Sequence, residues 1–444
     1  MEERFSGTHM NLQVEWDLIV VGAGAAGMMA AFRSASLGRR TLLLEKNTKA
    51  GVKILMSGGT RCNVTHDTDI RGILEAFGEQ GRFLRPALHA LSPADVVAFF
   101  ESSGVATKVE DTGKVFPASD RALDVQRALL RRMESVGVAL RLGQAVCDVR
   151  RGEQYWEVDT PGQTWRGSRL LVTTGGCSYP GCGTTGDAYP WMERLGHNIV
   201  TPRPALVPLT SPASWVQDLS GLTLEDALVR VVPRETVAQV SRIGDLNQRL
   251  ALVRKQQRAE RRSSLLLTHF GLSGPAAMDV SRRVTDCGRA DEVQLVCDLL
   301  PEWTVERLQS ELSQQVERQG QRSIGRWLSE ALPVPQRLVG SLLQQISVDP
   351  QQRIAELSKA SRLELLAHLK SLVVPVSGSR GFTKAEVTAG GVSLSDVDSK
   401  TMASRRAEGL YLAGEVLDID GPIGGYNFQA AFSTGWLAAD SASQ

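Results

Sequence analysis

The stretch WDLIVVGAGAAGMMAAFRSASLGRRTLLLEKN, residues 16–47, decides the fold of this chain. It begins with a short β-branched run typical of a buried strand. The glycine turn GAGAAG follows, then a helix rich in small residues and a second apolar run that ends in Glu45. This order and spacing are typical of a βαβ unit that binds a dinucleotide. We therefore predict an α/β protein with a Rossmann-like domain.

The residues of the glycine turn have separate physical roles in such a unit. Gly22 makes the tight turn, Gly24 lets the backbone approach a pyrophosphate, and Gly27 allows close packing of helix on strand. The first helical turn, with Ala25 and Ala26, offers free N–H groups and a positive dipole end to the diphosphate. The alternative is a glycine turn that only packs a helix. The correct order and spacing of strand, glycines, helix, strand and acid disfavour this alternative.

The acid that closes the second strand narrows the choice of dinucleotide. Glu45 lies 18 residues after Gly27, where a carboxylate accepts hydrogen bonds from the hydroxyls of the adenosine ribose. An acid rather than a basic residue at this position favours FAD or NAD over NADP. Lys46, the next residue, is a further candidate for cofactor binding.

Two later segments favour FAD. Residues 408–442 predict a strand at 409–413, a glycine turn with acids and a helix from about residue 427, and they resemble the second FAD motif of flavoprotein reductases. A strand at 168–173 followed by TGG resembles the turn that closes the FAD site. A helix N-terminus near the flavin would stabilise its anionic reduced ring, whereas an ordinary connection is the alternative. The cofactor-binding candidates in these segments are Thr174, Gly175, Gly414, Glu415, Gly424, Gly425, Tyr426 and Asn427.

Several longer motifs identify a family. KILMSGGTRCNVTH, TGGCSYPGCGTTGDAY, LLLTHFGLSGPAAMDVSRR and LYLAGEVLDIDGPIGGYNFQAAFSTG together resemble the BaiN/RdsA-like family of NAD(P)/FAD-dependent oxidoreductases, from about residue 16 to 440. The resemblance implies an FAD domain split by an insertion with a β-barrel-like part and a helical part. It also implies flavin-dependent reduction or oxidation of carbon–carbon double bonds, in bile-acid-type steroids or in the formation of dihydrouridine in large-subunit ribosomal RNA.

The middle of the chain fits that layout. Short apolar runs predict strands at 204–211, 222–232, 264–270 and 292–300, whereas leucine periodicity predicts helices over 302–371. We expect a discontinuous FAD-binding domain of residues 15–202 and 373–444, a β-barrel-like insertion of residues 203–300 and a helical subdomain of residues 301–372.

Composition sets further bounds. Fifty Lys and Arg residues almost balance 49 Asp and Glu residues, so the overall charge names no partner. The six cysteines show no paired CxxC spacing, which predicts reduced thiols and no metal site. The chain has no apolar run of about 18 residues or more, and the polar segment 1–13, which we expect to be an extension, lacks the centre of a signal peptide. We therefore expect a cytoplasmic protein without a membrane span.

The stretch SGGTRCN, residues 57–63, carries the candidate chemistry. Reduction of an alkene conjugated to a carbonyl needs a hydride on one carbon and a proton on the other, hence a general acid. Cys62 is the candidate donor because the pKa of a thiol is tunable. The alternative is that Ser57 and Gly58 bind FAD and Cys62 only packs behind their loop. Lys53 and Arg61 are candidates for cofactor binding, by holding an anion or polarising a carbonyl.

A local basic run bears on the substrate. Between Arg242 and Arg262 seven basic residues stand against two acids, a net charge of 7 − 2 = +5 over 21 residues. Such a surface suits a phosphate backbone, and a solvated helix face is the alternative. His269 ends a predicted strand and either lines a substrate entrance or bonds locally. The substrate-binding candidates are Arg254, Lys255, Arg258, Arg261, Arg262 and His269.

Together these features predict an FAD-dependent enzyme that reduces a conjugated double bond, converting uridine to dihydrouridine in large-subunit (23S) ribosomal RNA. One alternative is an NAD(P)H-dependent reductase or dehydrogenase of a small molecule such as a steroid or bile-acid enone. Another is a flavin-binding ribosome-associated protein without turnover. The sequence has no second GxGxxG motif directly after a predicted strand, so NAD(P)H as electron donor would have to dock transiently.

Overall fold

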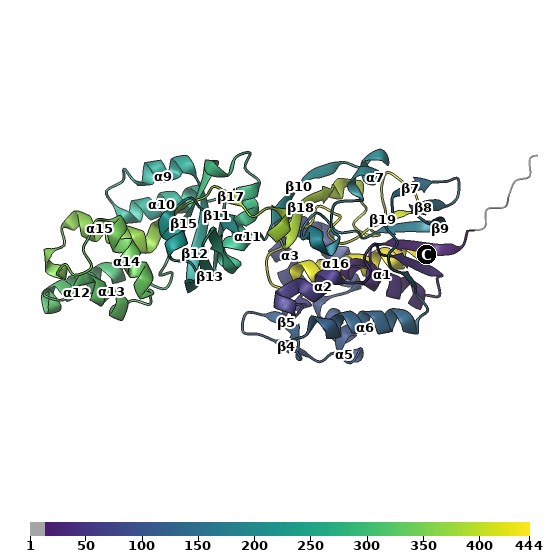
Figure 1. The fold of residues 1–444 in the computed structure, drawn as a ribbon, viewed down its shortest axis with the longest axis horizontal. Helices are drawn as coiled ribbons and strands as arrows, with labels where there is room; N and C mark the ends of the chain where they lie inside the picture. Colours follow the sequence, from purple (N-terminus) through teal and green to yellow (C-terminus); the bar gives the residue numbers. More distant parts are fainter. Residues whose placement is uncertain (1–13) are drawn as a thin grey trace, which may run out of the picture. The chain divides into compact units, whose positions relative to one another are not determined.

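The computed structural model describes residues 14–444, so segment 1–13, which we expected to be an extension, lies outside the described residues. The chain divides into two compact units, shown in Figure 1. Unit 1 comprises the chain up to Pro202 together with Thr388–Gln444, and unit 2 comprises Arg203–Val387.

Unit 1 is built on a seven-stranded sheet in the order β6-β2-β1-β9-β8-β7, with β19 also paired to β9. Strands β6, β2, β1, β9 and β19 run parallel, whereas β7 and β8 are antiparallel additions. The strands are β1 (Trp16–Val21), β2 (Thr41–Leu44), β6 (Ala139–Arg141), β7 (Asp148–Arg151), β8 (Trp156–Thr160), β9 (Gln163–Val172) and β19 (Leu410–Leu412). This arrangement confirms the predicted α/β fold with a Rossmann-like domain.

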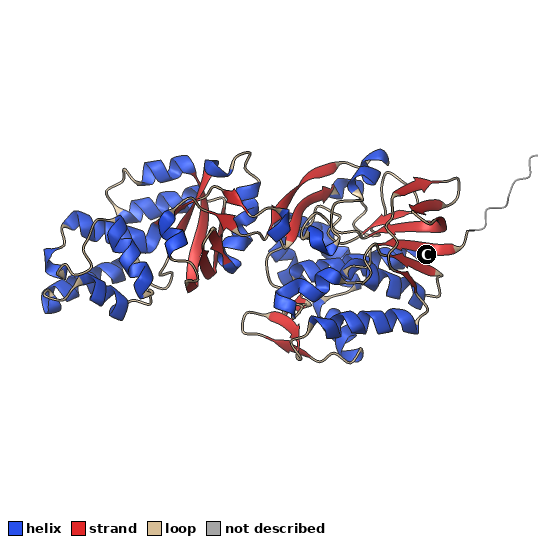
Figure 2. Cartoon of the chain, in the orientation of Figure 1, coloured by secondary structure: helices blue, strands red, loops and turns tan. Residues whose placement is uncertain are grey.

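Helices flank this sheet, which explains why β2 is buried throughout and reads as a continuous apolar run (Figure 2). Helix α1 packs against α6 and α16, and α16 also packs against α4. The helices are α1 (Ala25–Ser36), α2 (Val52–Met56), α3 (Ile70–Phe77), α4 (Gly81–Ala90), α5 (Pro93–Ser102), α6 (Ala122–Ser135), α7 (Tyr189–Arg194) and α16 (Tyr426–Ala442). A small antiparallel sheet of β3 (Thr65–His66), β5 (Lys114–Pro117) and β4 (Thr107–Val109) completes the unit.

The strand register places three loops together. Val21 at the end of β1 pairs with Val172 at the end of β9, which in turn pairs with Leu412 at the end of β19. Because parallel strands end at the same edge of a sheet, the loops that follow these three residues leave side by side. Ligands of open α/β sheets bind at such an edge, so the candidate site begins there.

Unit 2 contains an antiparallel sheet in the order β16-β15-β12-β13-β14-β11-β17. Its strands are β11 (Leu209–Thr210), β12 (Thr223–Pro233), β13 (Ala259–Thr268), β14 (Gly271–Ser273), β15 (Val293–Asp298), β16 (Leu372–Pro375) and β17 (Gly378–Ser379). Within the described chain the order is open, from β16 to β17, which differs from the barrel-like insertion that we expected. Separately, β10 (Ile199–Ala205) and β18 (Val387–Val392) form a two-stranded sheet where the chain passes between units.

The helices of unit 2 share one hydrophobic core with its sheet. Leu308 and Trp327 from the helical segment lie in the same cluster as Val229 and Leu295 of the sheet, so residues 301–372 do not separate as a subdomain. The helices are α8 (Ser214–Asp218), α9 (Arg234–Val240), α10 (Leu246–Gln256), α11 (Gly274–Thr285), α12 (Val305–Gln319), α13 (Ile324–Ala331), α14 (Gln336–Gln345) and α15 (Lys359–Ser371). Residues 373–387, expected in the FAD domain, lie in unit 2 because β16 pairs with β15.

Candidate functional site

The three glycine-bearing loops at the carboxyl edge of the unit 1 sheet are in direct contact. Gly22 has φ +101°, and a Cβ on it would lie 2.7 Å from the carbonyl oxygen of Thr173. A Cβ on Gly414 would lie 2.9 Å from the Cβ of Ala26. The turn after β1 is therefore packed against the loops after β9 and β19, and three segments identified separately in the sequence form one site.

The start of α1 is open on one side and closed on the other. A Cβ on Gly27 would lie only 1.9 Å from the carbonyl oxygen of Gly22, so helix and turn touch there. A Cβ on Gly24 would meet nothing within 4 Å. Gly24 caps α1 without a side-chain hydrogen bond, and the first turn contains no acid. N–H groups in such a turn lack intrahelical acceptors and, with the helix dipole, bind anions.

Glu45 is fixed toward this turn. Its carboxylate accepts hydrogen bonds from the backbone N–H of Ala23 at 2.8 Å and of Asn47 at 2.9 Å, and its side chain is buried. Each carboxylate oxygen keeps a lone pair for a further donor. Lys46 next to it pairs with Asp187 and donates to Thr185, so its expected contact with a cofactor stays a prediction.

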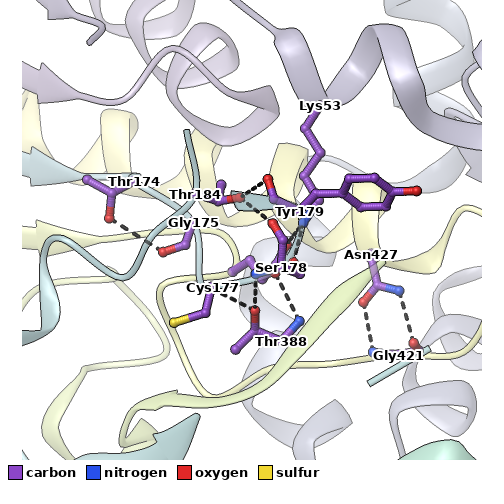
Figure 3. Close-up of polar contacts among 11 residues, drawn as sticks. Lys53, Thr174, Gly175, Cys177, Ser178, Tyr179, Thr184, Thr388, Gly421 and Asn427 are labelled. Carbon is purple, nitrogen blue, oxygen red and sulfur yellow. Dashed lines mark hydrogen bonds and ion pairs between the residues drawn. The ribbon is translucent and has the colours of Figure 1, made fainter. Parts of the chain in front are cut away.

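A network of polar side chains lies beside the glycine loops (Figure 3). The Lys53 ammonium donates to Ser178 Oγ at 2.7 Å and to Glu415 Oε2 at 2.6 Å, and Ser178 Oγ–H donates to Glu415 Oε1 at 2.6 Å. The side chains of Lys53 and Glu415 keep 27% and 19% of their exposure, so the pair is largely shielded from water. The sequence indicated Lys53 and Glu415, but not that they meet through Ser178.

Thr388 joins this network to the loop after β9. Its Oγ1 accepts from the N–H of Cys177 at 2.8 Å and of Ser178 at 3.0 Å, and its own N–H donates to Glu415 Oε1 at 2.9 Å (Figure 3). Sequence reasoning missed Thr388 because no local pattern marks it. The next residue of the loop, Tyr179, has φ +54°, a left-handed conformation that side chains rarely adopt and that clusters at functional sites.

Thr174 and Gly175, the expected cofactor contacts of the same loop, have few contacts of their own. The Thr174 hydroxyl lies 3.5 Å from the Gly175 carbonyl oxygen, a long hydrogen bond. A Cβ on Gly175 would lie 3.0 Å from the Thr184 methyl group, which places Gly175 against the later part of the loop. Their cofactor role stays a prediction.

In the SGGTRCN stretch, Cys62 is completely buried. Its φ is +62°, its N–H donates to the Ser57 carbonyl at 3.1 Å, and burial raises the pKa of its thiol to about 12. The thiol therefore keeps its proton at neutral pH and is screened from solvent in this conformation. The Ser57 hydroxyl donates back to the carbonyl of Ile54, whereas Gly58 is exposed. Catalysis by Cys62 and FAD binding by Ser57 and Gly58 stay predictions.

Arg61 is held by protein groups. Its guanidinium pairs with Glu110 at 2.6 Å and Asp120 at 3.5 Å and lies 4.0 Å from the centre of the Phe116 ring. The hydrogen bond that Arg61 donates to Glu110 is the main cause that raises the pKa of Arg61. These contacts fix the loop, and contact of Arg61 with a cofactor stays a prediction.

The residues after Cys62 pack against the C-terminal glycine segment. His66 Nδ1 lies 3.0 Å from the Gly424 carbonyl oxygen, and its ring stacks on Tyr426 with centroids 4.6 Å apart. A Cβ on Gly425 would lie 2.4 Å from the carbonyl oxygen of Thr65. The loop that follows the Glu45 strand and the segment that follows β19 are thus in contact. His66 gave no signal in the sequence.

Asn427 and Asn63 differ in how their amides are used. The Asn427 amide accepts from the Gly421 N–H at 2.8 Å and donates to the Gly421 carbonyl at 2.9 Å, so it clamps its own turn (Figure 3). The Oδ1 of Asn63 is buried without a hydrogen-bond partner in the described residues, and a Cβ on Gly425 would lie 2.7 Å from it. Such an orphaned oxygen next to a glycine turn indicates a missing donor.

Three of the six arginines in the basic run of unit 2, Arg249, Arg261 and Arg262, pair with carboxylates. Arg261 pairs with Asp279 at 2.8 Å, and Arg262 pairs with Asp226 at 2.7 Å and also with Glu302. The remaining candidates are exposed. Arg258 donates to a cysteine sulfur at 3.3 Å, whereas Arg254 and Lys255, at the end of α10, have no ion pair among the described residues, and His269 packs edge-to-face on Phe270.

The residues at the edge of the unit 1 sheet fit FAD. The uncapped start of α1 suits a diphosphate, Glu45 retains acceptor capacity for ribose hydroxyls, and the orphaned Asn63 oxygen lies by the C-terminal glycine turn. Within residues 14–444, no three His, Cys, Asp or Glu side chains are grouped to hold a metal ion. No helix in this part of the chain has the length and apolar character to cross a membrane.

Comparison with known proteins gives consistent relatives. A family model described as HI0933-like protein Rossmann domain matches residues 16–441. The chain is 32% identical over 424 residues to a protein of Escherichia coli named ribosomal RNA dihydrouridine synthase, covering 96% of this chain and 97% of that one. It is 30% identical to a protein of the same name from Haemophilus influenzae, with 96% and 98% covered. It is 27% identical to a 3-dehydro-bile acid delta(4,6)-reductase of Clostridium scindens, again with 96% and 98% covered.

Proposed function

Because the chain belongs to the HI0933-like family of FAD-dependent oxidoreductases, we propose that it converts a uridine of large-subunit ribosomal RNA to dihydrouridine. The family assignment confirms the resemblance found in the sequence. The observation that carries the substrate is the full-length similarity to two ribosomal RNA dihydrouridine synthases, at 32% and 30% identity. The relative that acts on a bile acid is more distant, at 27%.

The geometry at the edge of the sheet supports the proposed cofactor site. The N–H groups at the start of α1 would hold the diphosphate, Glu45 would accept from the ribose hydroxyls, and the 414–427 segment would contact the flavin. FAD, when bound, supplies the hydride that reduces the double bond. The orphaned Asn63 Oδ1 would accept a hydrogen bond from the cofactor. NAD(P)H is the proposed source of electrons.

The proton for the second carbon comes from the protein. Cys62 is the proposed donor, since a thiol with a pKa of about 12 is fully protonated at neutral pH. Such a weak acid gives up its proton only to a strongly basic group. The enolate-like carbon formed from the substrate would be such a group once it lies next to the thiol. Lys53, fixed by Ser178 and Glu415, provides a shielded cation that polarises a substrate carbonyl.

Binding of the RNA backbone falls to the basic residues that lack ion pairs. Within the basic run of unit 2 these include Arg254 and Lys255, with Arg258 close in sequence. Their guanidinium and ammonium groups contact phosphates and release counterions. Arg261 and Arg262 contribute less because carboxylates already neutralise them.

Analysis of ribosomal RNA from a deletion strain tests the proposal. Nucleoside mass spectrometry should show loss of dihydrouridine from 23S RNA, restored by the wild-type gene and not by a variant that fails to bind FAD. Unchanged dihydrouridine in the deletion strain contradicts the proposed substrate. A purified protein without a flavin absorbance band contradicts the cofactor as well.

The bile-acid relative makes reduction of a steroid enone the second candidate. The purified protein with NADH and a bile-acid enone should then consume NADH in step with loss of the enone. Consumption of NADH only with the RNA transcript supports the RNA reaction. Flavin binding without turnover of either substrate favours a non-catalytic ribosome-associated role.

A further inference from the structure

A positively lined hollow lies in unit 1 outside the glycine loops. Helices α3 and α4, with the short turn of 3-10 helix η2 (Gly78–Gln80) between them, line an open hollow of about 380 Å³. This size is at the small end of ligand pockets. The lining residues are Arg71, Leu74, Glu75, Gly78, Arg82 and Arg85.

The hollow has an excess of positive charge. Three guanidinium groups face one carboxylate, a net charge of 3 − 1 = +2. Arg71 is paired with Glu75 at 2.8 Å, but Arg82 and Arg85 have neither a hydrogen bond nor an ion pair among the described residues. Both are exposed, and because they are three residues apart on α4 they point to the same side of the helix. Two free guanidinium forks on one side of a hollow match the oxygens of a phosphate.

The turn that lines the hollow packs against the C-terminal glycine segment, residues 414–427. A Cβ on Gly421 would lie 2.7 Å from the ring of Phe77, so this ring packs on the segment backbone. Gln80 donates to the carbonyl of Asp418 at 2.8 Å and accepts from the N–H of Asp420 at 3.3 Å. Phe77 and Gln80 flank Gly78, which lines the hollow. An anion bound in the hollow would therefore lie close to the backbone of the proposed flavin segment, residues 414–427.

We propose that the hollow formed by Arg71, Arg82 and Arg85 binds a backbone phosphate of the RNA whose uridine is reduced at the flavin site. The inference rests on the proposed function and adds an RNA contact on the flavin-binding unit itself. Three arginine side chains against one carboxylate favour an anionic ligand. Leu74 is the one large apolar side chain in the lining.

The test measures RNA affinity as a function of salt with the full-length holoenzyme. The variant is Arg82→Gln with Arg85→Gln. The control, Arg121→Gln with Arg127→Gln, removes the same charge elsewhere in unit 1. Arg121 caps the N-terminus of α6 and Arg127 lies within that helix; both are exposed and have no ion pair or side-chain hydrogen bond among the described residues. The conservative variant Arg82→Lys with Arg85→Lys keeps the charge. The probe is a transcript of large-subunit ribosomal RNA, and flavin absorbance verifies that each variant is folded.

Loss of the contact to one phosphate should lower the slope of log affinity against log salt by about 0.7, the contribution of each phosphate contact to a single strand. Between 50 and 200 mM salt the wild-type affinity then falls about 2.6-fold more than that of the glutamine variant. The control should keep the wild-type slope, and the lysine variant should recover most of it. This pattern supports the inference.

Equal slopes of log affinity against log salt for the glutamine variant and the control overturn the phosphate site. If the wild-type protein still forms dihydrouridine in that case, the proposed function stands. If the wild type neither binds the transcript nor forms dihydrouridine, both proposals fail. Retained RNA binding together with loss of polyglutamate binding in the glutamine variant would overturn the inference in favour of an acidic protein partner.

Discussion

Alanine at Gly24 and at Gly27 should separate cofactor binding from folding, although the two glycines are three residues apart. A Cβ on Gly27 would lie 1.9 Å from the Gly22 carbonyl oxygen and 2.6 Å from Thr173 Oγ1. To reach 3.0 Å, the backbone must move by 3.0 − 1.9 = 1.1 Å. Such overpacking costs about 3 kcal/mol, and the higher helix propensity of alanine returns about 1 kcal/mol. We expect Gly27→Ala to destabilise unit 1 by about 2 kcal/mol.

Gly24→Ala should have the opposite profile. Its Cβ would meet no protein atom within 4 Å, and φ −81° is allowed for alanine, so stability should change by less than about 0.5 kcal/mol. The added methyl group occupies the space proposed for the diphosphate. FAD affinity should therefore fall at least about tenfold, equivalent to about 1.4 kcal/mol.

Two assays distinguish these outcomes. Urea unfolding of the flavin-free protein, followed by circular dichroism, reports stability, and titration with FAD, followed by flavin fluorescence, reports affinity. Gly24→Ala with wild-type FAD affinity would refute the placement of the diphosphate over Gly24. Gly27→Ala with a wild-type unfolding midpoint would refute the close packing of α1 on its turn.

Four further predictions concern other groups. Cys62→Ser and Cys62→Ala should each lower dihydrouridine formation by about 10²–10⁴ with flavin reduction by NAD(P)H unchanged, and full activity in both contradicts a proton-donor role. Burial lowers the pKa of His197, so wild-type stability should fall as pH drops through about 6.5, where the unfolded chain takes up the proton. The urea midpoint of His197→Gln should lack this loss between pH 7 and 5. Lys53→Met removes the cation of a shielded network and should lower stability by about 1–2 kcal/mol in urea unfolding, with no change if the network is unimportant. Arg261→Gln with Arg262→Gln should leave the salt dependence of RNA binding nearly unchanged while destabilising unit 2.

The sequence predicted those parts of the site that depend on short-range spacing. The turn around Gly22, the acid Glu45 and the loop before Glu415 were all identified, because parallel strands bring their carboxyl ends to one edge whatever the intervening chain does. The contact of Thr388 with Ser178 joins residues 210 positions apart, and its hydrogen bonds depend on the three-dimensional position of the loop after β9. No local pattern encodes such a contact.

Charge shows the same limit more sharply, because the density of charge along a chain does not measure the charge that a surface presents. The run from Arg242 to Arg262 carries +5 in sequence, yet antiparallel pairing of β12 with β13 brings Asp226 to Arg262 and sets Arg230 opposite Glu260. Residues 71–85 contain three arginines and two glutamates, a net charge of only +1, and gave no signal. Helical spacing nevertheless leaves two of those arginines side by side without a carboxylate partner in the described structure. Phosphate binding requires unpaired basic groups, so the weakly charged stretch 71–85 offers candidate contacts, Arg82 and Arg85, as the strongly charged run does in Arg254 and Lys255.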